Sequence, residues 1–356
     1  MKIIFVIPDL SSGGAERVIS ILSDSFVKRE LDVDVLLLQE HRVCYTVSDK
    51  VNIVYLGENL LTCSKKKACQ IMRGYFKKQK EQYGKVIAVP FLDVSLKRVL
   101  VATFGLKIPI IASERNDPYQ KGRGLVNRIK ANLPYCLASH CVFQTPGARE
   151  YYGKVVQKKG SVIMNPLMMP GYVSWKGQKS KRMVSVGRLE PQKNQMLLIN
   201  AFAQIHKIYP EYTLDIYGEG SLRKSLQQRI DELGLRDTVF LRGYSADIYA
   251  ILEESLLFVL SSDYEGLSNA LIEAMAVGMP VISTDHPCGG AKVLIQNNEN
   301  GILVPVNDES AIVLAMKQVI EDADLALALG ERARLVRELL SIDRVTTEWK
   351  TVFDRV

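Results

Sequence analysis

Long apolar runs are missing from this chain of 356 residues. No segment approaches the roughly 18 uninterrupted apolar residues that a membrane-spanning helix needs. The opening segment reaches a charged residue at Asp9 too early for a signal peptide, so a first buried strand is the better interpretation. These absences predict a cytoplasmic protein without a membrane span.

Paired cysteine motifs and metal-ligand patterns are also missing. The six cysteines include no CxxC pair and show no metal-ligand spacing with the four histidines. We therefore expect free thiols in a reducing compartment and neither a metal site nor another cofactor. Internal repeats and low-complexity tracts are not evident, so a repeat architecture is not expected.

Charge is unevenly divided along the chain, although the net charge of +7 hides this. Residues 1–176 carry 27 Lys and Arg against 14 Asp and Glu, whereas residues 177–356 carry 19 against 25. The division predicts two domains with different partners, and the basic half would suit an anionic surface or ligand. The alternative is that the positive charge serves only solubility.

Short apolar segments alternate with helical stretches in both halves. The expected strands are 2–8, 33–38, 52–56, 85–89, 109–113, 140–144, 161–164, 182–187, 212–217, 238–241, 256–260, 280–283 and 301–304. The expected helices are 15–28, 65–82, 94–104, 125–133, 195–208, 222–233, 247–254, 269–277, 310–321 and a tail at 332–356. This alternation indicates parallel sheets covered on both faces. The expected fold class is therefore α/β, with two doubly wound Rossmann-like domains facing each other across a cleft.

The domain boundary is expected just after Asn165-Pro166, where the chain becomes rich in glycine and polar residues. The predicted parts are an N-terminal domain at 1–166, a linker at 167–180, a C-terminal domain at 181–336 and a final helix at 337–356. That helix packs on one of the two domains. Because open parallel sheets bind ligands beyond the carboxyl ends of their strands, the site should lie in the cleft and use residues that follow strands.

The most informative segment runs from Ser261 to Val277 and contains two carboxylates eight positions apart, Glu265 and Glu273. The helix expected from Asn269 is apolar almost all round, and Glu273 is its only charge. A buried carboxylate is costly unless a partner binds it. The preceding loop places a glycine at a helix N-terminus, which favours an anion. The segment therefore predicts a ligand with hydroxyls near one end and negative charge near the other.

Other strand-end segments carry glycine or charge. Gly13 and Gly14 form a turn that is neither a GxGxxG motif nor a P-loop, and a simple tight turn is the alternative. Arg188 and Lys193 lie in one strand-to-helix loop, where two cations can hold a diphosphate or can be merely solvated. Charges also gather at 113–118, alternatively a capped helix start, and turns of structural type occur at 217–220 and 243–245.

Together these residues resemble the retaining glycosyltransferases of family 4, which have the GT-B fold. Glu265 and Glu273 match the EX7E signature of that family, with Asp263–Ser268 and Ala274–Ile282 as its context. The segments Gly13–Arg17 and Gly187–Lys193 match two further signatures. The resemblance covers nearly the whole chain, and it implies sugar transfer from a nucleotide-sugar donor, most simply a UDP-sugar, without a metal.

The resemblance also implies a role for each matching residue. Glu265, Arg188 and Lys193 would be catalytic, with Glu265 at the sugar and the two cations on the diphosphate. Glu273 would bind the ribose. Gly14 would supply a further donor contact. The backbone of Gly243 and Tyr244 would receive the base, and the backbone amides of Gly266, Leu267 and Ser268 would contact the sugar or phosphate.

One position departs from the family pattern. Many members have a histidine that touches the donor sugar after the strand expected at 109–113, and here Arg115 falls at that place, followed by Asn116. The sequence around these residues is similar to that of a subgroup of bacterial polysaccharide and oligosaccharide glycosyltransferases. Gly13, Arg115 and Asn116 are therefore candidate sugar or acceptor contacts.

The expected acceptor is a glycan, in particular one linked by pyrophosphate to a polyprenyl lipid. The helical stretch 64–85 carries eight Lys and Arg with apolar residues between them, and it predicts contact with an anionic membrane surface. An ordinary solvated helix is the alternative.

Three other classes of protein are alternatives to a glycosyltransferase. A sugar-nucleotide epimerase shares the fold, and a phosphorylase shares it too but would be longer. A basic nucleic-acid-binding protein would need a recognised motif, which this sequence lacks. No nucleic-acid partner is expected.

Overall fold

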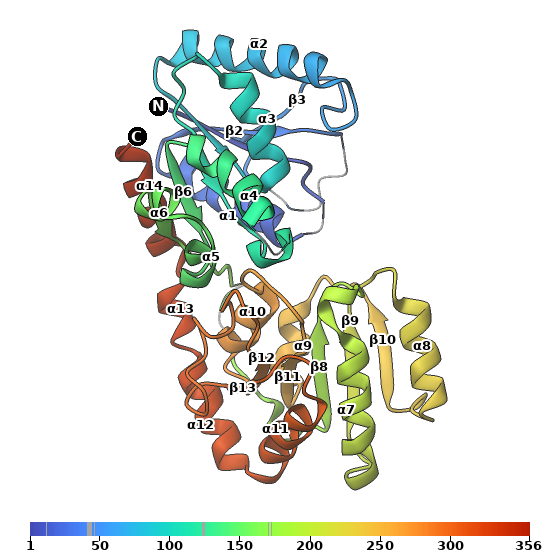
Figure 1. The fold of residues 1–356 in the computed structure, drawn as a ribbon. Coiled ribbons are helices and arrows are strands. Elements are labelled where there is room, and N and C mark those ends of the chain that lie inside the picture. The colour runs from blue at the N-terminus through green and yellow to red at the C-terminus, as the bar shows by residue number, and fades with distance from the viewer. Residues whose placement is uncertain (12, 41–44, 46, 123–124, 170, 172) are drawn as a thin grey trace. The chain divides into compact units, whose positions relative to one another are not determined.

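The computed structural model describes residues 1–11, 13–40, 45, 47–122, 125–169, 171 and 173–356. The chain forms two compact units, which are described separately. Unit 1 consists of Met1–Met168 together with Leu340–Val356, and unit 2 of Met169–Leu339. Unit 1 is therefore built from both ends of the sequence (Figure 1).

Unit 1 is built around parallel strands. They are β1 (Lys2–Ile7), β2 (Asp32–Leu37), β3 (Asn52–Tyr55), β4 (Val86–Pro90), β5 (Ile111–Ser113), β6 (His140–Phe143) and β7 (Gly160–Val162). Their order is β3-β2-β1-β4, and the bridges Ala88–Ile110 and Phe91–Ser113 continue it through β5-β6-β7. All six residues of β1 are buried because helices cover both faces of the sheet.

The helices of unit 1 fall on two faces according to the direction of each crossover. They are α1 (Gly14–Lys28), α2 (Lys65–Tyr83), α3 (Asp93–Thr103), α4 (Leu125–Leu137), α5 (Pro146–Tyr151), α6 (Lys154–Lys158) and α14 (Ile342–Asp354). Parallel crossovers are right-handed, so α2, α3 and α4 follow one another on one face and α1 lies on the other. Figure 1 shows α3 between α2 and α4, and α14 contacts α1.

The helix α14 completes the core of unit 1. Phe353 packs at a tilt against Phe26 with ring centroids 5.1 Å apart, and Trp349 stacks on Phe91 with centroids 6.1 Å apart. The single helix expected at 332–356 is wrong in its extent. The chain there forms the end of α12 (Ala323–Ala333), then α13 (Val336–Leu339) and α14, because Ser341 pairs with Leu167 as an extended bridge.

Unit 2 contains a single parallel sheet. Its strands are β8 (Arg182–Val186), β9 (Thr213–Tyr217), β10 (Val239–Gly243), β11 (Leu257–Leu260), β12 (Val281–Thr284) and β13 (Ile302–Val304), in the order β10-β9-β8-β11-β12-β13. Its helices include α7 (Gln195–Ile208), α8 (Arg223–Glu232), α9 (Ile248–Glu254), α10 (Asn269–Val277) and α11 (Glu309–Glu321). Strand order reverses between β8 and β11, and this is the position where such sheets bind ligands.

The segment expected as a linker is attached to unit 2 over much of its length. Trp175 is buried, and its Nε1 donates to the carbonyl oxygen of Ser255 at 2.7 Å. The amide of Ser174 donates to Glu253. In the part of the chain that the structure describes, no helix has the length and apolarity to cross a membrane.

Candidate active site in unit 2

The loops after β8 and β11 meet at the point where strand order reverses in unit 2. The first loop contains Arg188 and the short helix η3 (Pro191–Lys193), and the second runs from Ser261 to Ser268. Several hydrogen bonds join them: for example, the amide of Asp263 donates to the carbonyl of Gln192 at 2.9 Å, and Ser261 Oγ donates to the carbonyl of Lys193 at 3.0 Å. The structure therefore brings the two predicted loops together.

An ion pair between Lys193 and Glu265 links these loops. The Lys193 side chain is 14% exposed and that of Glu265 is 8% exposed. Lys193 Nζ contacts Glu265 Oε1, which also accepts from Ser262 Oγ at 2.8 Å. Gln192 Nε2 donates to Oε2 of Glu265 at 3.2 Å. A cation expected at a diphosphate and a carboxylate expected at a sugar thus neutralise each other.

The helix α10 begins directly after the glutamate loop. Ser268 is its N-cap, and its side chain accepts from the amide of Leu271. Glu273 is buried on this helix, as its apolar surroundings predicted. Gly266 is packed closely: a Cβ on Gly290 would lie 1.8 Å from the Gly266 carbonyl oxygen. The loop is therefore held by contacts that tolerate no side chain at Gly290.

The other donor-site candidates of unit 2 follow strands at the same edge of the sheet. Arg188 is exposed, and its Nη2 is 3.5 Å from Gln192 Oε1. Gly243 ends β10 with a φ of 77°, which favours glycine, and Tyr244 beside it is 75% exposed. Gly218 has a φ of 139°, and a Cβ there would lie 2.0 Å from the carbonyl of Gly187. Close backbone packing thus requires glycine along this edge.

Sequence reasoning missed His286, which follows β12 at the same edge. Its side chain is buried, and neither ring nitrogen has a hydrogen-bond partner among the described residues. Burial lowers the pKa of the imidazole, although the carboxylates of Glu265 and Asp285 oppose that change. The rule that ligand residues follow strands would have pointed to this position. Ser262 and Gln192 were also missed, although both lie inside the predicted loops.

The glycine turn of unit 1 follows β1. Gly13 is the N-cap of α1 and is extended, and the Glu16 side chain packs against it so closely that a Cβ would lie 2.0 Å from Glu16 Oε2. Tyr45 Oη donates to the Gly13 carbonyl at 3.0 Å. Gly14 is exposed at the start of the helix. This geometry places both glycines at the carboxyl edge of the unit 1 sheet.

Arg115 lies inside unit 1, whereas its neighbour Asn116 is exposed. The guanidinium of Arg115 stacks over Phe91 at 4.5 Å and over Trp349 at 5.5 Å. Its Nε donates to Ser113 Oγ, and its Nη1 donates to Asn165 Oδ1. Burial lowers the pKa of Arg115 to about 9. These contacts favour a structural role for Arg115, and only Asn116 keeps an exposed side chain for a substrate.

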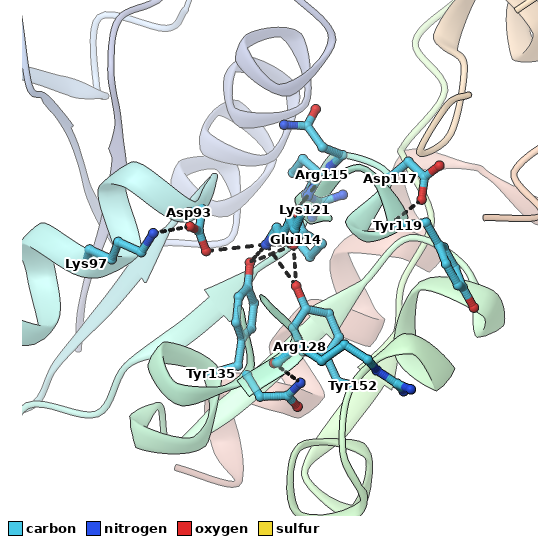
Figure 2. A network of polar contacts seen from close by, with 12 residues as sticks. Asp93, Lys97, Glu114, Arg115, Asp117, Tyr119, Lys121, Arg128, Tyr135 and Tyr152 are labelled. Atoms are coloured by element: carbon cyan, nitrogen blue, oxygen red, sulfur yellow. Dashed lines mark hydrogen bonds and ion pairs between the residues drawn. The ribbon is translucent and has the colours of Figure 1, made fainter. Parts of the chain in front are cut away.

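A second polar cluster in unit 1 was not expected. Figure 2 shows Lys121 at its centre, in contact with the carboxylates of Glu114 and Asp93. Tyr135 Oη donates to Glu114 at 2.8 Å, and Tyr152 Oη donates to the same carboxylate. Burial, together with the charge of Glu114, raises the pKa values of both phenols. Burial alone would lower the pKa of Lys121, but Glu114 and Asp93 raise it.

Solved structures that align with the whole chain identify its fold. The Anabaena protein HepE, in a complex with UDP and glucose, aligns over 100% of both chains with a TM-score of 0.84 and 19% identity. Sucrose-phosphate synthase from Thermosynechococcus elongatus aligns over 99% of this chain and 98% of its own, with a TM-score of 0.84 and 18% identity. The chain therefore has the GT-B fold, as the sequence predicted.

Residues 174–336, which form most of unit 2, match the family model of glycosyl transferases group 1. The protein is a glycosyltransferase, which confirms the predicted enzyme class.

Two curated relatives, both from Campylobacter jejuni, match almost end to end. One is GalNAc-alpha-(1->4)-GalNAc-alpha-(1->3)-diNAcBac-PP-undecaprenol alpha-1,4-N-acetyl-D-galactosaminyltransferase, which is 28% identical over 98% of this chain and 97% of the relative. The other is N-acetylgalactosamine-N,N'-diacetylbacillosaminyl-diphospho-undecaprenol 4-alpha-N-acetylgalactosaminyltransferase, which is 29% identical over 94% of each.

Proposed function

We propose that the protein transfers an N-acetylhexosamine or hexose from a UDP-sugar to a hydroxyl of a polyprenyl-diphosphate-linked glycan, with retention at the anomeric carbon. Bacterial surface polysaccharide or oligosaccharide assembly is the proposed setting. The observation that carries this proposal is the Lys193–Glu265 pair at the switch point of the unit 2 sheet. The Campylobacter relatives, which act on undecaprenyl-diphosphate-linked glycans, support the acceptor class and make UDP-N-acetylgalactosamine the first donor to test.

In this proposal the donor spans the loops of unit 2. Its base lies at the backbone of Gly243 and Tyr244, and its ribose hydroxyls lie at the Glu273 carboxylate. Arg188 and Lys193 hold the diphosphate. Glu265, with the backbone amides of the 266–268 loop, receives the sugar. The buried position of Glu265 beside Lys193 supports this order, because the sugar and the diphosphate are adjacent in the donor.

The bonds, electrons and protons of the proposed reaction are all accounted for without a cofactor. The acceptor hydroxyl oxygen forms a bond to the anomeric carbon as the bond from that carbon to the diphosphate oxygen breaks. The bonding electron pair leaves with the diphosphate, and a phosphate oxygen on the same face takes the hydroxyl proton. Charge on the leaving diphosphate grows in the transition state, so the cations of Arg188 and Lys193 act where they are most effective.

We also propose that no metal ion takes part, since two cations already face the diphosphate position. Turnover in the presence of EDTA should then equal turnover with added magnesium or manganese. A requirement for a divalent cation would contradict this part of the proposal.

A membrane-bound acceptor implies a surface that meets lipid, and we propose the face of unit 1 formed by α2, α3 and α4. The exposed side chains of α2 include six cations, namely Lys65, Lys66, Lys67, Arg73, Lys77 and Lys78. Apolar side chains are exposed on the neighbouring helices, with Phe104 83% exposed after α3, and Ile129, Leu133 and Leu137 more than half exposed along one stripe of α4. Cations beside exposed apolar groups match an anionic bilayer. Peripheral attachment to the inner face of the plasma membrane would follow.

The donor is tested by thermal shift with UDP-, GDP- and ADP-sugars, because a ligand that binds only the folded state raises the melting temperature. The positive donor is then incubated with a synthetic polyprenyl-diphosphate-linked disaccharide, and NMR of the product gives the anomeric configuration. An inverted product would contradict retention. Release of free nucleotide with an epimerised sugar and no acceptor would instead support the sugar-nucleotide epimerase alternative.

A further inference from the structure

The unpaired histidine at the end of β12 has no role in the mechanism above. The His286 side chain is 1% exposed, and both Nδ1 and Nε2 lack a hydrogen-bond partner among the described residues. Backbone bonds fix its position, since Asp285 donates to the Val304 carbonyl at 2.8 Å and Gly289 donates to the His286 carbonyl at 2.8 Å. Burying a polar ring without partners is unfavourable, so a partner is expected in another state of the protein.

The ring lies against the glutamate loop. A Cβ on Gly290 would be 3.0 Å from Cε1 of His286 and 1.8 Å from the Gly266 carbonyl oxygen, so ring and loop pack on the same glycine. The carboxylates of Glu265 and Asp285 raise the pKa of the imidazole and the cation of Lys193 lowers it, so these charges lie near the ring. His286 is thus a close neighbour of the Lys193–Glu265 ion pair and of the loop that carries Glu265.

Binding of the nucleotide-sugar donor would leave the Glu265 carboxylate in need of a new hydrogen-bond partner. When a diphosphate draws Lys193 away, Glu265 loses its cation inside a site where it is almost fully buried. Ser262 Oγ and Gln192 Nε2 remain as its side-chain donors. Removing one partner of a buried ion pair is strongly unfavourable unless another donor replaces it.

We propose that His286 is a positioning residue that donates a hydrogen bond from its ring to the Glu265 carboxylate once the donor diphosphate has taken Lys193. The role rests on the proposed function, because it needs a diphosphate at Lys193. A neutral imidazole carries one N–H donor, and burial lowers the pKa of His286 and so favours this neutral form. The bond would keep Glu265 in place against the sugar while its former cation faces the leaving group.

The test compares His286→Leu with His286→Gln, whose amide restores a donor near the position of Nε2. UDP is the probe, and calorimetry gives its affinity. We expect His286→Leu to weaken UDP binding about tenfold or more, the worth of one hydrogen bond to a charged group. We expect His286→Gln to recover most of the loss. His206→Leu is the matched control, because His206 also has an unpaired Nδ1 but lies near the far end of α7.

A double-mutant cycle separates this role from mere packing. With Lys193→Met, Glu265 has no cation to lose, so adding His286→Leu should change UDP affinity less than about twofold. An equal loss in both backgrounds, or wild-type UDP affinity in a folded His286→Leu protein, would overturn the role of His286 and leave the proposed function intact. Wild-type protein that binds no UDP would contradict the proposed donor, and the role of His286 with it. The melting temperature of each unliganded variant shows that it is folded.

Discussion

Each unit holds a lysine–glutamate ion pair beyond a parallel strand, and in each the lysine ends a short 3-10 helix that begins with proline. In unit 1 the pair is Lys121–Glu114, and in unit 2 it is Lys193–Glu265. The surroundings differ. Lys121 also contacts Asp93 and two tyrosine hydroxyls, whereas among the residues that the structure describes Lys193 Nζ contacts the side-chain oxygen of Glu265 alone.

The two lysines differ in the number of their side-chain partners. In unit 1 both oxygens of Glu114 are engaged, with Oε2 bound by Lys121 and two phenols and Oε1 accepting from the amides of Arg115 and Asn116. A ligand could gain nothing there without breaking several bonds. Under the proposed function, a diphosphate replaces Glu265 as the partner of Lys193, and the histidine near the pair has no hydrogen-bond partner among the described residues. We therefore propose that the few partners of Lys193 and the lack of partners at His286 distinguish a binding site from a structural ion pair.

The largest expected effect is on the stability of unit 1. Lys121→Met leaves Glu114 and Asp93 without their shared cation, and we expect it to lower the free energy of unfolding by about 3–5 kcal/mol. Urea unfolding measures this. Lys77→Met is the control, because the Lys77–Glu81 pair is exposed and 3.8 Å long, and its loss should cost less than about 1 kcal/mol. Equal stability of the two variants would remove the distinction between the pairs.

The next effect is on catalysis in unit 2. Arg188→Ala, with Lys193 intact, should lower turnover of the glycosyltransferase by about 10²-fold or more, because one electrostatic contact to the leaving group is lost. Its stability should change little, since Arg188 is exposed. Steady-state kinetics with the donor found by thermal shift check this expectation. Near-normal turnover of the folded variant would show that Arg188 does not contact the diphosphate.

A smaller effect should distinguish the surfaces of the two units. Replacing Phe104 and Leu133 with serine in unit 1 should weaken binding to vesicles of phosphatidylserine and phosphatidylcholine by about tenfold, because apolar groups leave the bilayer. Leu314→Ser in unit 2 removes a side chain of similar exposure, 67%, and should have no effect.

Flotation at low and high salt measures the vesicle binding, which should weaken as salt screens the α2 cations. Equal binding to neutral vesicles would contradict the electrostatic part. Loss of binding to a protein partner without a change in vesicle binding would identify a protein-docking surface instead.

The smallest effect concerns pH. Since the pKa of His286 is lowered on folding from its ordinary 6.5, the unfolded chain binds more protons between the two values. Stability is therefore lost as pH falls below about 6.5, by at most about 1.4 kcal/mol per pH unit for this group. His286→Leu should lose less stability than wild type between about pH 7 and pH 5 in urea titrations. Identical losses would show that His286 is not buried neutral.

Much of the fold could be predicted from the sequence because apolar strands and amphipathic helices have clear lengths and periods. The expected bounds of α7 and α10 agree with the structure to the residue. The tail could not be predicted in the same way. Its break at Leu340–Ser341 depends on a bridge to Leu167, which is distant in the sequence.

Some features of the candidate site could likewise be predicted from the sequence, and others could not. Motif residues such as Lys193 and Glu265 could be named because loops after parallel strands meet at one edge. Their mutual ion pair could not be foreseen, since it depends on side-chain placement. Arg115 was a candidate sugar or acceptor contact because it falls where many family members have a histidine. Its stacking over Trp349, more than 200 positions away, could not be predicted from local sequence.

The return of the chain to unit 1 has a consequence for how the protein is made. The rings of Phe26 and Phe91 are covered by α14, which leaves the ribosome only after all of unit 2. At about 5–20 residues per second, the N-terminal part would wait on the order of ten seconds or longer for that cover. During synthesis unit 1 therefore presents an unfilled apolar surface to chaperones and to neighbouring nascent chains, while all of unit 2 is already available to fold.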